Sequence, residues 1–539
     1  MRTVPRIAAA AALAGLLLTG CTGGGSGGGS GDGQGGQRTA RPQPGTLRVL
    51  AGSELSDLEP VLKAAEKATG VKVVPTYSGT LDAVQQIASG QADRSYDAVW
   101  LPSDDYLRLH PEAARRIGSE TPVMTSPVAL GVRPEAVRRL GWDPGKVTWA
   151  QIGQAVTEGR LTYGMTDPAR SNSGYSALVG LASALSGAQS ALTEQDVRHA
   201  APALKRFFAG QKLTSGSSGW LAQAYARQGS VDALINYESV LLSLNRDSHT
   251  DLTVIRPVDG VVTADYPLTL LASAGTDQRT AYTALTRYLR SPGAQQAITR
   301  QTLRRPVVAS VAPDPRLPAG RRRELPFPGS RAVADGLLDS YENQLRRPSR
   351  TVYVLDTSGS MDGSRLSRLK TALAGLTGTD AAPGERFRDR EEVTLMPFAD
   401  TVKGVLGHTV EEGRRQQALD AIRADADALR ADGGTAIYSS LQEAYRYLGQ
   451  RADEAGGDRF TSIVLMTDGE NTAGESADDF NAFYAALPAD QRSVPVFPIL
   501  FGDSDRAELQ HIADLTGGRL FDAVGSSLSG AFEEIRGYQ

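Results

Sequence analysis

The sequence Val-Tyr-Val-Leu-Asp-Thr-Ser-Gly-Ser-Met, residues 352–361, decides how the last third of this chain folds. It begins as a short run of apolar and β-branched residues, which is typical of a buried parallel strand. It ends in small residues with side-chain oxygens, which suit a loop at the carboxyl edge of a sheet. Asp356, Ser358 and Ser360 alternate along this loop, so their oxygens can turn toward one point. A hard divalent cation such as Mg²⁺ requires a compact set of oxygen ligands of this kind.

Two later stretches supply further residues with side-chain oxygens that could complete such a ligand set. Residues 433–438 read Gly-Gly-Thr-Ala-Ile-Tyr, and Thr435 stands there at the expected start of a helix. Residues 463–470 read Ile-Val-Leu-Met-Thr-Asp-Gly-Glu, a second apolar strand that ends at Asp468. The pattern Asp-x-Ser-x-Ser, then Thr, then Asp resembles the von Willebrand factor A (VWA) domain and its metal-ion-dependent adhesion site (MIDAS). The resemblance covers about residues 349–539 and implies a doubly wound, Rossmann-like α/β domain.

The resemblance also implies roles for five residues. Ser358, Ser360 and Thr435 would offer hydroxyl groups to the ion, whereas Asp356 and Asp468 would act mostly through water or hydrogen bonds. The implied ion is Mg²⁺, with Mn²⁺ or Ca²⁺ as alternatives. Neutral hydroxyl ligands leave most of the ion's charge uncompensated. In the family, a Glu or Asp of a partner protein completes the coordination shell.

Three other interpretations of the motif are weaker. Asp-Thr-Ser at residues 356–358 resembles the active-site triplet of aspartic proteases, but those enzymes need two carboxylates, and a second such triplet is absent from the sequence. Haloacid-dehalogenase phosphatases begin with Asp-x-Asp, and Ser358 occupies the second of these positions. Asp-x-Ser-x-Ser alone also suits a helix cap. The addition of Thr435 and Asp468 favours metal binding.

Residues 1–21 have the pattern of an export signal. Arg2 and Arg6 precede the apolar run Ile7–Leu18, which is too short to span a bilayer. The following Leu-Thr-Gly-Cys resembles the bacterial lipobox, in which lipid is attached to the cysteine. Cys21 is the chain's one cysteine, so we expect a lipoprotein signal peptide and a lipidated Cys21. The alternative is an ordinary secretory signal with a chance cysteine.

Residues 22–45 are rich in Gly and Ser and predict a flexible tether. An engineered linker is the alternative, but the position directly after the lipobox favours a natural spacer. The expected location is therefore the extracytoplasmic face of the cell membrane, with a lipid anchor. The length of 539 residues indicates several domains. The net charge of −4 gives no sign of nucleic-acid binding.

Residues 46–330 alternate between strand and helix patterns. Thr46–Ala51 and Val71–Tyr77 read as strands, and each is followed by residues at helical spacing, Leu55–Thr69 and Leu81–Ser89. This βαβ arrangement predicts an α/β domain with a parallel sheet. In such sheets ligands bind outside the carboxyl ends of the strands.

This region resembles two-lobed extracytoplasmic solute-binding proteins of the periplasmic-binding-protein type. The turn Tyr77–Thr80 followed by Ala83–Ile87 is similar to their oxyanion-binding branch, and a second lobe would start near Met124–Val132. The resemblance implies a cleft for an oxyanion or sugar between the lobes. Ser and Thr are also the ordinary helix N-caps, so capping is the alternative for each residue. The candidate solute-binding residues are Ser53, Ser78, Gly79, Thr80, Ser103, Ser171, Ser173, Tyr175 and Tyr237.

Residues 331–348 read as a connecting helix and linker, with Leu337, Leu338, Tyr341 and Leu345 on one face. The sequence leaves open which of the two domains this helix braces. It also leaves open whether the domains are coupled.

The predicted function is recognition rather than catalysis. The five His residues are scattered, and the sequence offers no nucleophile–base pair. We therefore expect a cell-envelope lipoprotein that recognises or adheres to a protein partner through Mg²⁺ and an acidic residue of that partner, with an accessory solute-binding domain. The alternative is the substrate-binding receptor of an ABC-type transport system, with the VWA domain as a docking module.

Overall fold

The computed structural model describes residues 45–229, 231–320, 323–378, 386–451, 459–524 and 528–538. The predicted signal peptide, the lipidation site Cys21 and the tether up to residue 44 lie outside these ranges. None of the helices in the described part of the chain is both long enough and apolar enough to span a membrane.

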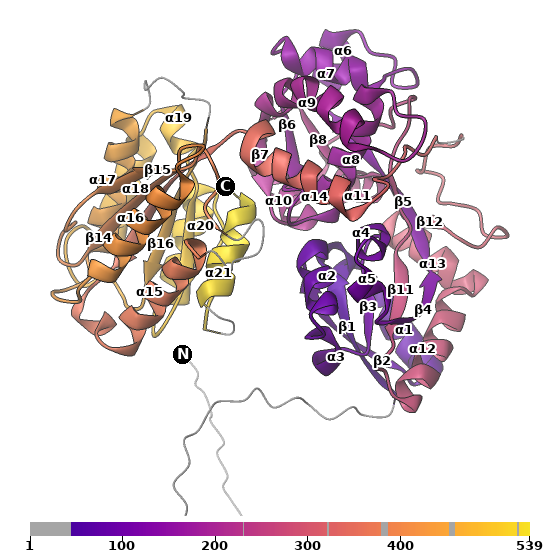
Figure 1. Cartoon of the computed structure of the whole chain (residues 1–539), viewed down its shortest axis with the longest axis horizontal. Helices are drawn as coiled ribbons and strands as arrows, with labels where there is room; N and C mark the ends of the chain where they lie inside the picture. The colour runs from indigo at the N-terminus through magenta and orange to yellow at the C-terminus, as the bar shows by residue number, and fades with distance from the viewer. Residues whose placement is uncertain are drawn as a thin grey trace, which may run out of the picture. The chain divides into compact units, whose positions relative to one another are not determined.

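The first lobe of the N-terminal domain is built on a five-stranded sheet in the order β2-β1-β3-β11-β4 (Figure 1). The first three of these strands are parallel, and Thr46 of β1 lies opposite Lys72 of β2. The βαβ pattern read from the sequence is confirmed in this lobe. The strands are β1 (Thr46–Gly52), β2 (Lys72–Ser78), β3 (Ala98–Trp100), β4 (Ile117–Pro122) and β11 (Pro267–Leu271).

Helices cover this sheet because their apolar residues recur at helical spacing. Helix α1 buries Val61 and Ala65 and ends at Gly70, whose φ of 73° is a left-handed conformation that glycine adopts without strain. The helical elements of this lobe are η1 (Ser53–Leu58), α1 (Glu59–Thr69), α2 (Thr80–Ala88), α3 (Ala92–Ser95), α4 (Asp105–Arg108), α5 (Pro111–Ala114), α12 (Thr276–Leu289) and α13 (Pro292–Thr302).

The second lobe has a seven-stranded sheet in the order β10-β5-β8-β6-β7, with β9 and β12 also paired to β5. The chain passes between the lobes from β4 to β5, from β10 to β11, and between α13 and β12. Its strands are β5 (Met124–Val132), β6 (Tyr163–Thr166), β7 (Gln211–Ser215), β8 (Ala233–Tyr237), β9 (Thr253–Ile255), β10 (Thr263–Ala264) and β12 (Arg305–Pro306). Its helices are α6 (Pro134–Leu140), α7 (Trp149–Thr157), α8 (Asn172–Ser186), α9 (Glu194–Ala209), α10 (Ser218–Gln228) and α11 (Glu238–Ser248).

Helix α14 (Arg331–Ser340) and the π-helical turn Tyr341–Leu345 belong to the core of the N-terminal domain. Leu337 and Leu338 are buried in that core, and the Tyr341 ring lies 5.0 Å from the ring of Phe208. The sequence left open which domain this helix braces, and its apolar residues pack in the N-terminal domain. They close the first domain, and the chain then enters the second.

The C-terminal domain has a six-stranded sheet in the order β15-β14-β13-β16-β17-β18. All neighbouring strands are parallel except β14 and β15. The strands are β13 (Ser349–Asp356), β14 (Glu392–Phe398), β15 (Leu406–Thr409), β16 (Phe460–Thr467), β17 (Val496–Leu500) and β18 (Phe521–Asp522). The helical elements are η3 (Gly359–Met361), α15 (Ser364–Leu376), α16 (Arg415–Ala428), α17 (Ile437–Gln450), α18 (Ala477–Ala486), α19 (Ala489–Arg492), α20 (Arg506–Thr516), α21 (Leu528–Ile535) and η4 (Arg536–Tyr538).

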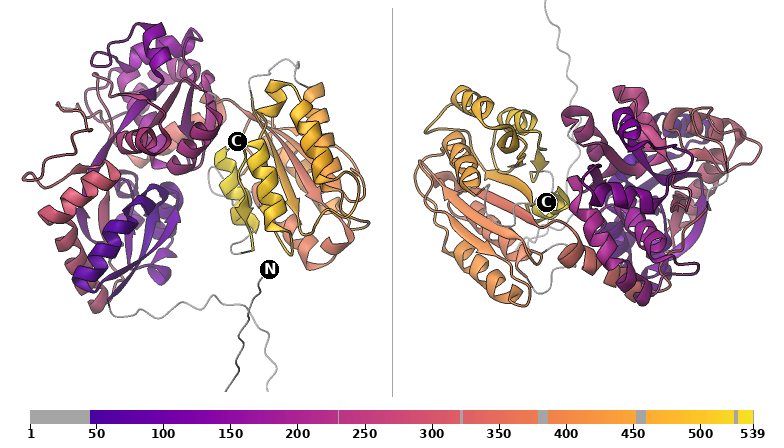
Figure 2. Two further views of the ribbon diagram at one scale, coloured as in Figure 1. Left: turned by 180° about the vertical axis from the view of Figure 1, so that it is seen from behind. Right: turned by 90° about the horizontal axis from the view of Figure 1, so that it is seen from above.

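Helices cover both faces of this sheet (Figures 1 and 2). Successive side chains of a strand point to opposite faces, so the apolar run of β13 serves two cores. Tyr353 and Leu355 pack with α15, α16 and α21, whereas Val352 and Val354 pack with α17, α18 and α20. The doubly wound α/β architecture expected for this domain is confirmed.

A group of buried charged side chains joins the two domains, whose described residues form one compact unit. Arg388 of the C-terminal domain donates to Asp167 Oδ2 of the second lobe at 3.1 Å. Its Nε donates to Glu342 Oε1 of the π-helical turn, also at 3.1 Å. Glu391, three residues after Arg388, accepts a hydrogen bond from Arg536 at 2.7 Å. Burial acts to raise the pKa of Glu391, but Arg536 and the neighbouring guanidinium groups outweigh it and hold that pKa below its ordinary value.

We predict that Arg388→Met destabilises the protein strongly, because Asp167 and Glu342 then lack the guanidinium that pairs them. Breaking a buried pair from one side costs about 3–5 kcal/mol. Denaturant unfolding of the whole chain measures the change. The control is Arg414→Met, since Arg414 pairs with Glu411 on the surface, and such pairs contribute about 0–1 kcal/mol. Equal unfolding midpoints for the two variants would contradict a structural role of Arg388.

Candidate functional site

The loop after β13 is held by Asp356, which is fully buried. Its Oδ1 accepts a hydrogen bond from the Ser358 backbone N–H at 2.8 Å. Its Oδ2 accepts one from the Thr467 hydroxyl at the end of β16, at 2.6 Å. Both carboxylate oxygens are therefore engaged within the protein, so Asp356 shapes the loop and links two neighbouring strand ends.

Three of the predicted metal residues form a continuous hydrogen-bonded chain. The Oγ atoms of Ser358 and Ser360 lie 3.0 Å apart. Ser360 Oγ donates to Asp468 Oδ1 at 2.8 Å. Ser360 is exposed, whereas Ser358 and Asp468 are buried. The side-chain oxygens of Ser358, Ser360 and Asp468 thus lie together, with Ser360 at the surface.

Thr435 joins the same group from the loop before α17. Its backbone N–H donates to Thr472 Oγ1 at 3.0 Å, which fixes the loop. A Cβ atom placed on Gly469 would lie 3.9 Å from Ser360 Oγ and 4.0 Å from Thr435 Oγ1. Both hydroxyl oxygens therefore lie beside Gly469. The structure brings all five predicted metal residues to the carboxyl edge of the sheet.

Arg365 of α15 is a charged neighbour that the sequence interpretation did not include. Its guanidinium donates to Asp468 Oδ2 at 2.5 Å and to Asp503 Oδ2 at 2.6 Å. Asp468 is thus already paired with one cation, as expected of a buried carboxylate. Arg365 follows the metal loop closely in the sequence, but only the folded chain shows which acid it meets.

The donor set fits a hard divalent cation. Every candidate ligand atom is an oxygen, as Mg²⁺ and Ca²⁺ prefer. Among the described residues, no group of three or more His, Cys, Asp or Glu side chains could hold a metal ion. The candidate centre therefore depends on its hydroxyl groups, with Asp356 and Asp468 behind them.

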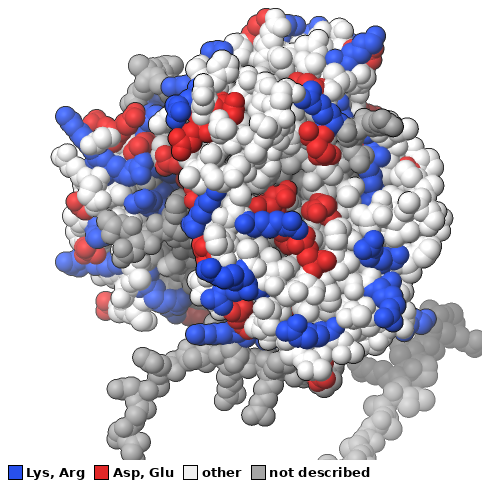
Figure 3. All heavy atoms as spheres, turned by 45° about the vertical axis from the view of Figure 1, so that its right-hand side comes forward, with Lys and Arg blue, Asp and Glu red and all other residues white. Residues whose placement is uncertain are grey.

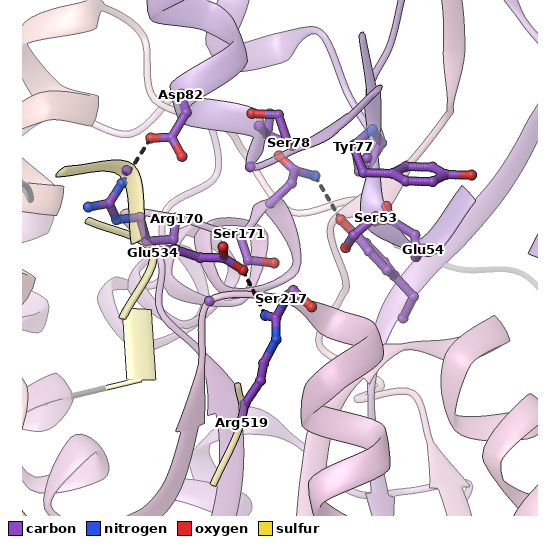
Figure 4. Close-up of a pocket in the computed structure, with 18 residues that line it drawn as sticks. Ser53, Glu54, Tyr77, Ser78, Asp82, Arg170, Ser171, Ser217, Arg519 and Glu534 are labelled. Atoms are coloured by element: carbon purple, nitrogen blue, oxygen red, sulfur yellow. Dashed lines mark hydrogen bonds and ion pairs between the residues drawn. The ribbon is translucent and has the colours of Figure 1, made fainter. Parts of the chain in front are cut away.

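A pocket of about 400 Å³ lies at the ends of several N-terminal-domain strands (Figure 4). The size is ordinary for a small-molecule site. Residues from both lobes line it. The predicted solute-binding residues that line it are Ser53, Ser78, Gly79, Thr80, Ser171 and Tyr237.

The other three candidates are engaged elsewhere in the described structure. Ser103 Oγ accepts from the Asp105 N–H at 3.1 Å, so it stabilises the turn that leads into α4. Ser173 Oγ lies 2.6 Å from Ser218 Oγ, inside the second lobe. The Tyr175 ring packs on Tyr106 at 5.2 Å between centroids.

Three helices begin at this pocket. They are α2 after Gly79, α8 after Ser171 and α10 after Ser217. Helix N-termini carry unpaired N–H groups and partial positive charge, which favour an anion. Ser217 Oγ caps its helix by accepting from Trp220 N–H, whereas Ser171 makes no side-chain cap. The capping alternative therefore fails for the candidate Ser171, whereas Ser217, which was not among the candidates, is a helix cap.

Charged groups of both signs also line the pocket, and the sequence interpretation missed them. Arg170 lies 3.2 Å from Asp82 of the other lobe. Glu54 Oε1 is buried, with no hydrogen-bond partner among the described residues. Burial raises the pKa of Glu54 to about 6. The proximity of Arg170 and Asp82 depends on how the lobes meet, which no local pattern reveals.

Gly79 lies where the two lobes approach each other closely. A Cβ atom there would lie 2.5 Å from the Arg170 carbonyl oxygen. We predict that Gly79→Ala forces the lobes apart, since φ is −65° and the backbone itself accepts alanine. Small-angle scattering should give a larger radius of gyration and heating a lower unfolding temperature. Gly293→Ala in α13 is the control, because a Cβ atom there meets nothing within 4 Å. Identical behaviour of the two variants would refute the contact.

Two family models match the chain. Residues 47–304 match the model described as bacterial extracellular solute-binding protein. Residues 352–533 match the von Willebrand factor type A domain. Both matches agree with the predicted order of domains.

Solved structures similar to this chain include two binding proteins. The periplasmic binding protein AfuA from Actinobacillus pleuropneumoniae, solved with fructose-6-phosphate bound, is 13% identical, with 56% of this chain and 98% of that chain covered and a TM-score of 0.45. The sulfate-binding protein SubI from Mycobacterium tuberculosis is 19% identical, with 50% and 88% covered and a TM-score of 0.39. The ligands in these names are those of the two proteins themselves.

Curated relatives match shorter stretches. An uncharacterized protein of Synechocystis sp. is 31% identical over 163 residues, which are 30% of this chain and 34% of that protein. Inter-alpha-trypsin inhibitor heavy chain H4 of Sus scrofa is 26% identical over 131 residues, which are 24% of this chain and 13% of that protein. The chain thus spans about a third or less of the length of these relatives. The family matches show that it contains a bacterial extracellular solute-binding domain, residues 47–304, followed by a von Willebrand factor type A domain, residues 352–533.

Proposed function

We propose that this protein is a lipid-anchored, extracytoplasmic binding protein. Its VWA domain recognises a protein partner through Mg²⁺ at the MIDAS, and its solute-binding domain holds a small anionic solute. The observation that carries the proposal is the hydrogen-bonded group of Ser358, Ser360 and Asp468, with the Thr435 hydroxyl beside the same glycine as Ser360 and with Asp356 holding the loop.

VWA domains commonly bind a divalent metal ion at this position. In this chain the hydroxyl groups of Ser358, Ser360 and Thr435 would hold it. Asp356 fixes the loop, and Arg365 holds Asp468 Oδ2, so that Oδ1 remains with Ser360. The bound ion supplies an open coordination position that attracts a carboxylate of the partner. Exposure of Ser360 leaves room for that carboxylate to approach.

A second candidate function is the receptor of a membrane transport system, which the solute pocket favours. The two candidate functions differ in whether binding of the protein partner requires the metal ion or the solute. In adhesion the partner depends on the metal, whereas in transport it depends on the solute. In both cases we propose binding rather than catalysis.

We propose no nucleic-acid partner. The net charge is −4. Basic and acidic side chains are intermixed over the described part of the face in Figure 3. Nucleic-acid binding generally needs a basic patch or stripe.

We predict that Thr435→Val weakens Mg²⁺ binding, because valine keeps the volume and removes one hydroxyl ligand. Even loss of an outer-shell partner lowers metal affinity about 10–100-fold, so we expect at least that effect in calorimetry. Thr371→Val, at an exposed site on α15, is the control.

Partner recovery from envelope extracts should fall in parallel with metal affinity, and chelator should abolish it for the wild type. If the amount of partner recovered is unchanged by metal, by chelator and by Thr435→Val, the adhesion proposal is rejected. Recovery of a membrane transport protein that requires solute and not Mg²⁺ would favour the second candidate.

The lipid anchor is proposed from the lipobox at Cys21 and the match to an extracellular family. We predict that Cys21→Ser moves the protein from the detergent phase to the aqueous phase in detergent partitioning. Ser26→Ala in the tether is the control and should stay with the detergent. Unchanged partitioning of Cys21→Ser would exclude lipid at this residue.

A further inference from the structure

The solute pocket has a wall that belongs to the VWA domain. Besides residues of both lobes, Arg519, Gly530 and Glu534 line it. Figure 4 shows the Arg519 and Glu534 side chains directed toward the pocket in which Ser171 and Ser217 lie. These residues lie far along the chain from the solute-binding family match, which ends at residue 304.

The end of the VWA domain is packed firmly on the loop before α10. A Cβ atom on Gly537 would lie 2.7 Å from Gly216 Cα, so the two backbones touch. The Tyr538 ring lies 4.7 Å from that of Trp220 in an edge-to-face arrangement, a geometry that adds to apolar burial. The position of α21 at the pocket is therefore set by close packing.

Arg519 is held in place on aromatic rings, and its guanidinium also donates a hydrogen bond to the Tyr538 hydroxyl. Its guanidinium lies 5.0 Å from the Phe521 ring and 5.6 Å from the Tyr538 ring. It also pairs with Glu534 at 2.8 Å, and these side chains are 34% and 50% exposed. A pair this exposed contributes little to stability. An anion in the pocket can therefore take over the guanidinium at small cost.

The chemistry of the pocket indicates the class of solute. Three helix N-termini and two arginines favour an anionic group. Glu54, Asp82 and Glu534 instead accept hydrogen bonds from donors such as hydroxyl groups. The volume of about 400 Å³ is within the range of organic ligands. A phosphorylated or carboxylated polyol satisfies both kinds of group.

We infer that Arg519 and Glu534 of the VWA domain determine the specificity of the solute site. Arg519 binds the anionic group of a small polyhydroxylated organic anion, and Glu534 accepts a hydrogen bond from one of its hydroxyl groups. The solute site is thus complete only when the VWA domain is in place. This inference rests on the proposed function of the pocket as a solute site.

The test uses the full-length chain with glucose 6-phosphate, glucose and inorganic phosphate as calorimetric probes. Arg519→Met keeps the apolar stem and removes the charge. We expect it to weaken glucose 6-phosphate binding roughly 10–100-fold, as for loss of a hydrogen bond to a charged group. Glu534→Gln should lower the affinity for glucose 6-phosphate relative to that for inorganic phosphate, because it weakens the acceptor for the sugar hydroxyl and removes the carboxylate that competes with phosphate for Arg519. Arg506→Met, which removes an exposed ion pair with Asp522 of the same domain, should bind all probes as the wild type does.

The outcomes distinguish a wrong role for Arg519 from a wrong assignment of the pocket as a solute site. If the wild type binds glucose 6-phosphate and Arg519→Met binds it equally well, the inference is wrong and the solute-site proposal stands. If the wild type binds inorganic phosphate alone, the assignment of an organic anion is wrong. If it binds none of the probes, both the anionic-solute proposal and the inference are rejected. Unchanged unfolding temperatures of the variants, and an intermediate affinity for Arg519→Lys, would show that binding rather than folding is affected.

Discussion

The arrangement of the two domains depends on one buried guanidinium. Arg388 comes from the VWA domain and hydrogen-bonds two acids of the N-terminal domain, Asp167 of the second lobe and Glu342 of the π-helical turn. All three side chains are at most 5% exposed. A buried charge is tolerated only when it is paired, so the buried contact between the domains requires Arg388 to meet Asp167 and Glu342. Such a network is a poor source of net stability but a strict selector of geometry. Glu391 extends it to Arg536, just after Glu534 in the chain. The pairing that fixes the domains therefore also places the end of α21 at the solute pocket.

The candidate metal centre and Arg519 lie at different levels of the VWA sheet. Asp356 ends β13, so the candidate metal centre lies at the carboxyl edge of the sheet. Arg519 precedes β18, whose Phe521 and Asp522 pair with Ile499 and Leu500 at the end of β17, so Arg519 lies short of that edge. Phe521 and Phe532 pack in the same core as Tyr353 of β13, and this core connects the two places.

The sequence predicts those parts of the fold and site that depend on short-range pattern. Asp356, Ser358 and Ser360 share one loop, so their spacing alone restricts where their oxygens can go. The alternating strands and helices of both domains follow from apolar periodicity in the same way. Contacts between distant segments are different. Arg365 and Arg519 became site neighbours only through packing, and an arginine on a helix or before a strand carries no local signal for this. Ser173 and Tyr175 are absent from the pocket lining for a related reason: α8 is buried along most of its length, so both side chains lie inside the lobe.

The mixture of charges in the pocket limits what it can hold. Three helix N-termini favour negative charge, yet Glu54 presents a buried carboxylate oxygen with no partner among the described residues. With a pKa of about 6, this group is mostly ionised at neutral pH, where a second anion beside it would be repelled. An inorganic oxyanion could satisfy the helix ends and would leave Glu54 unpaired. A solute with an anionic group at one end and hydroxyl groups at the other satisfies both, because each hydroxyl can donate to a carboxylate. Arg519 and Glu534 also place a cation, which can bind an anionic group, beside a carboxylate, which can accept a hydrogen bond from a hydroxyl group. The pocket is therefore built for a molecule with two chemically different ends.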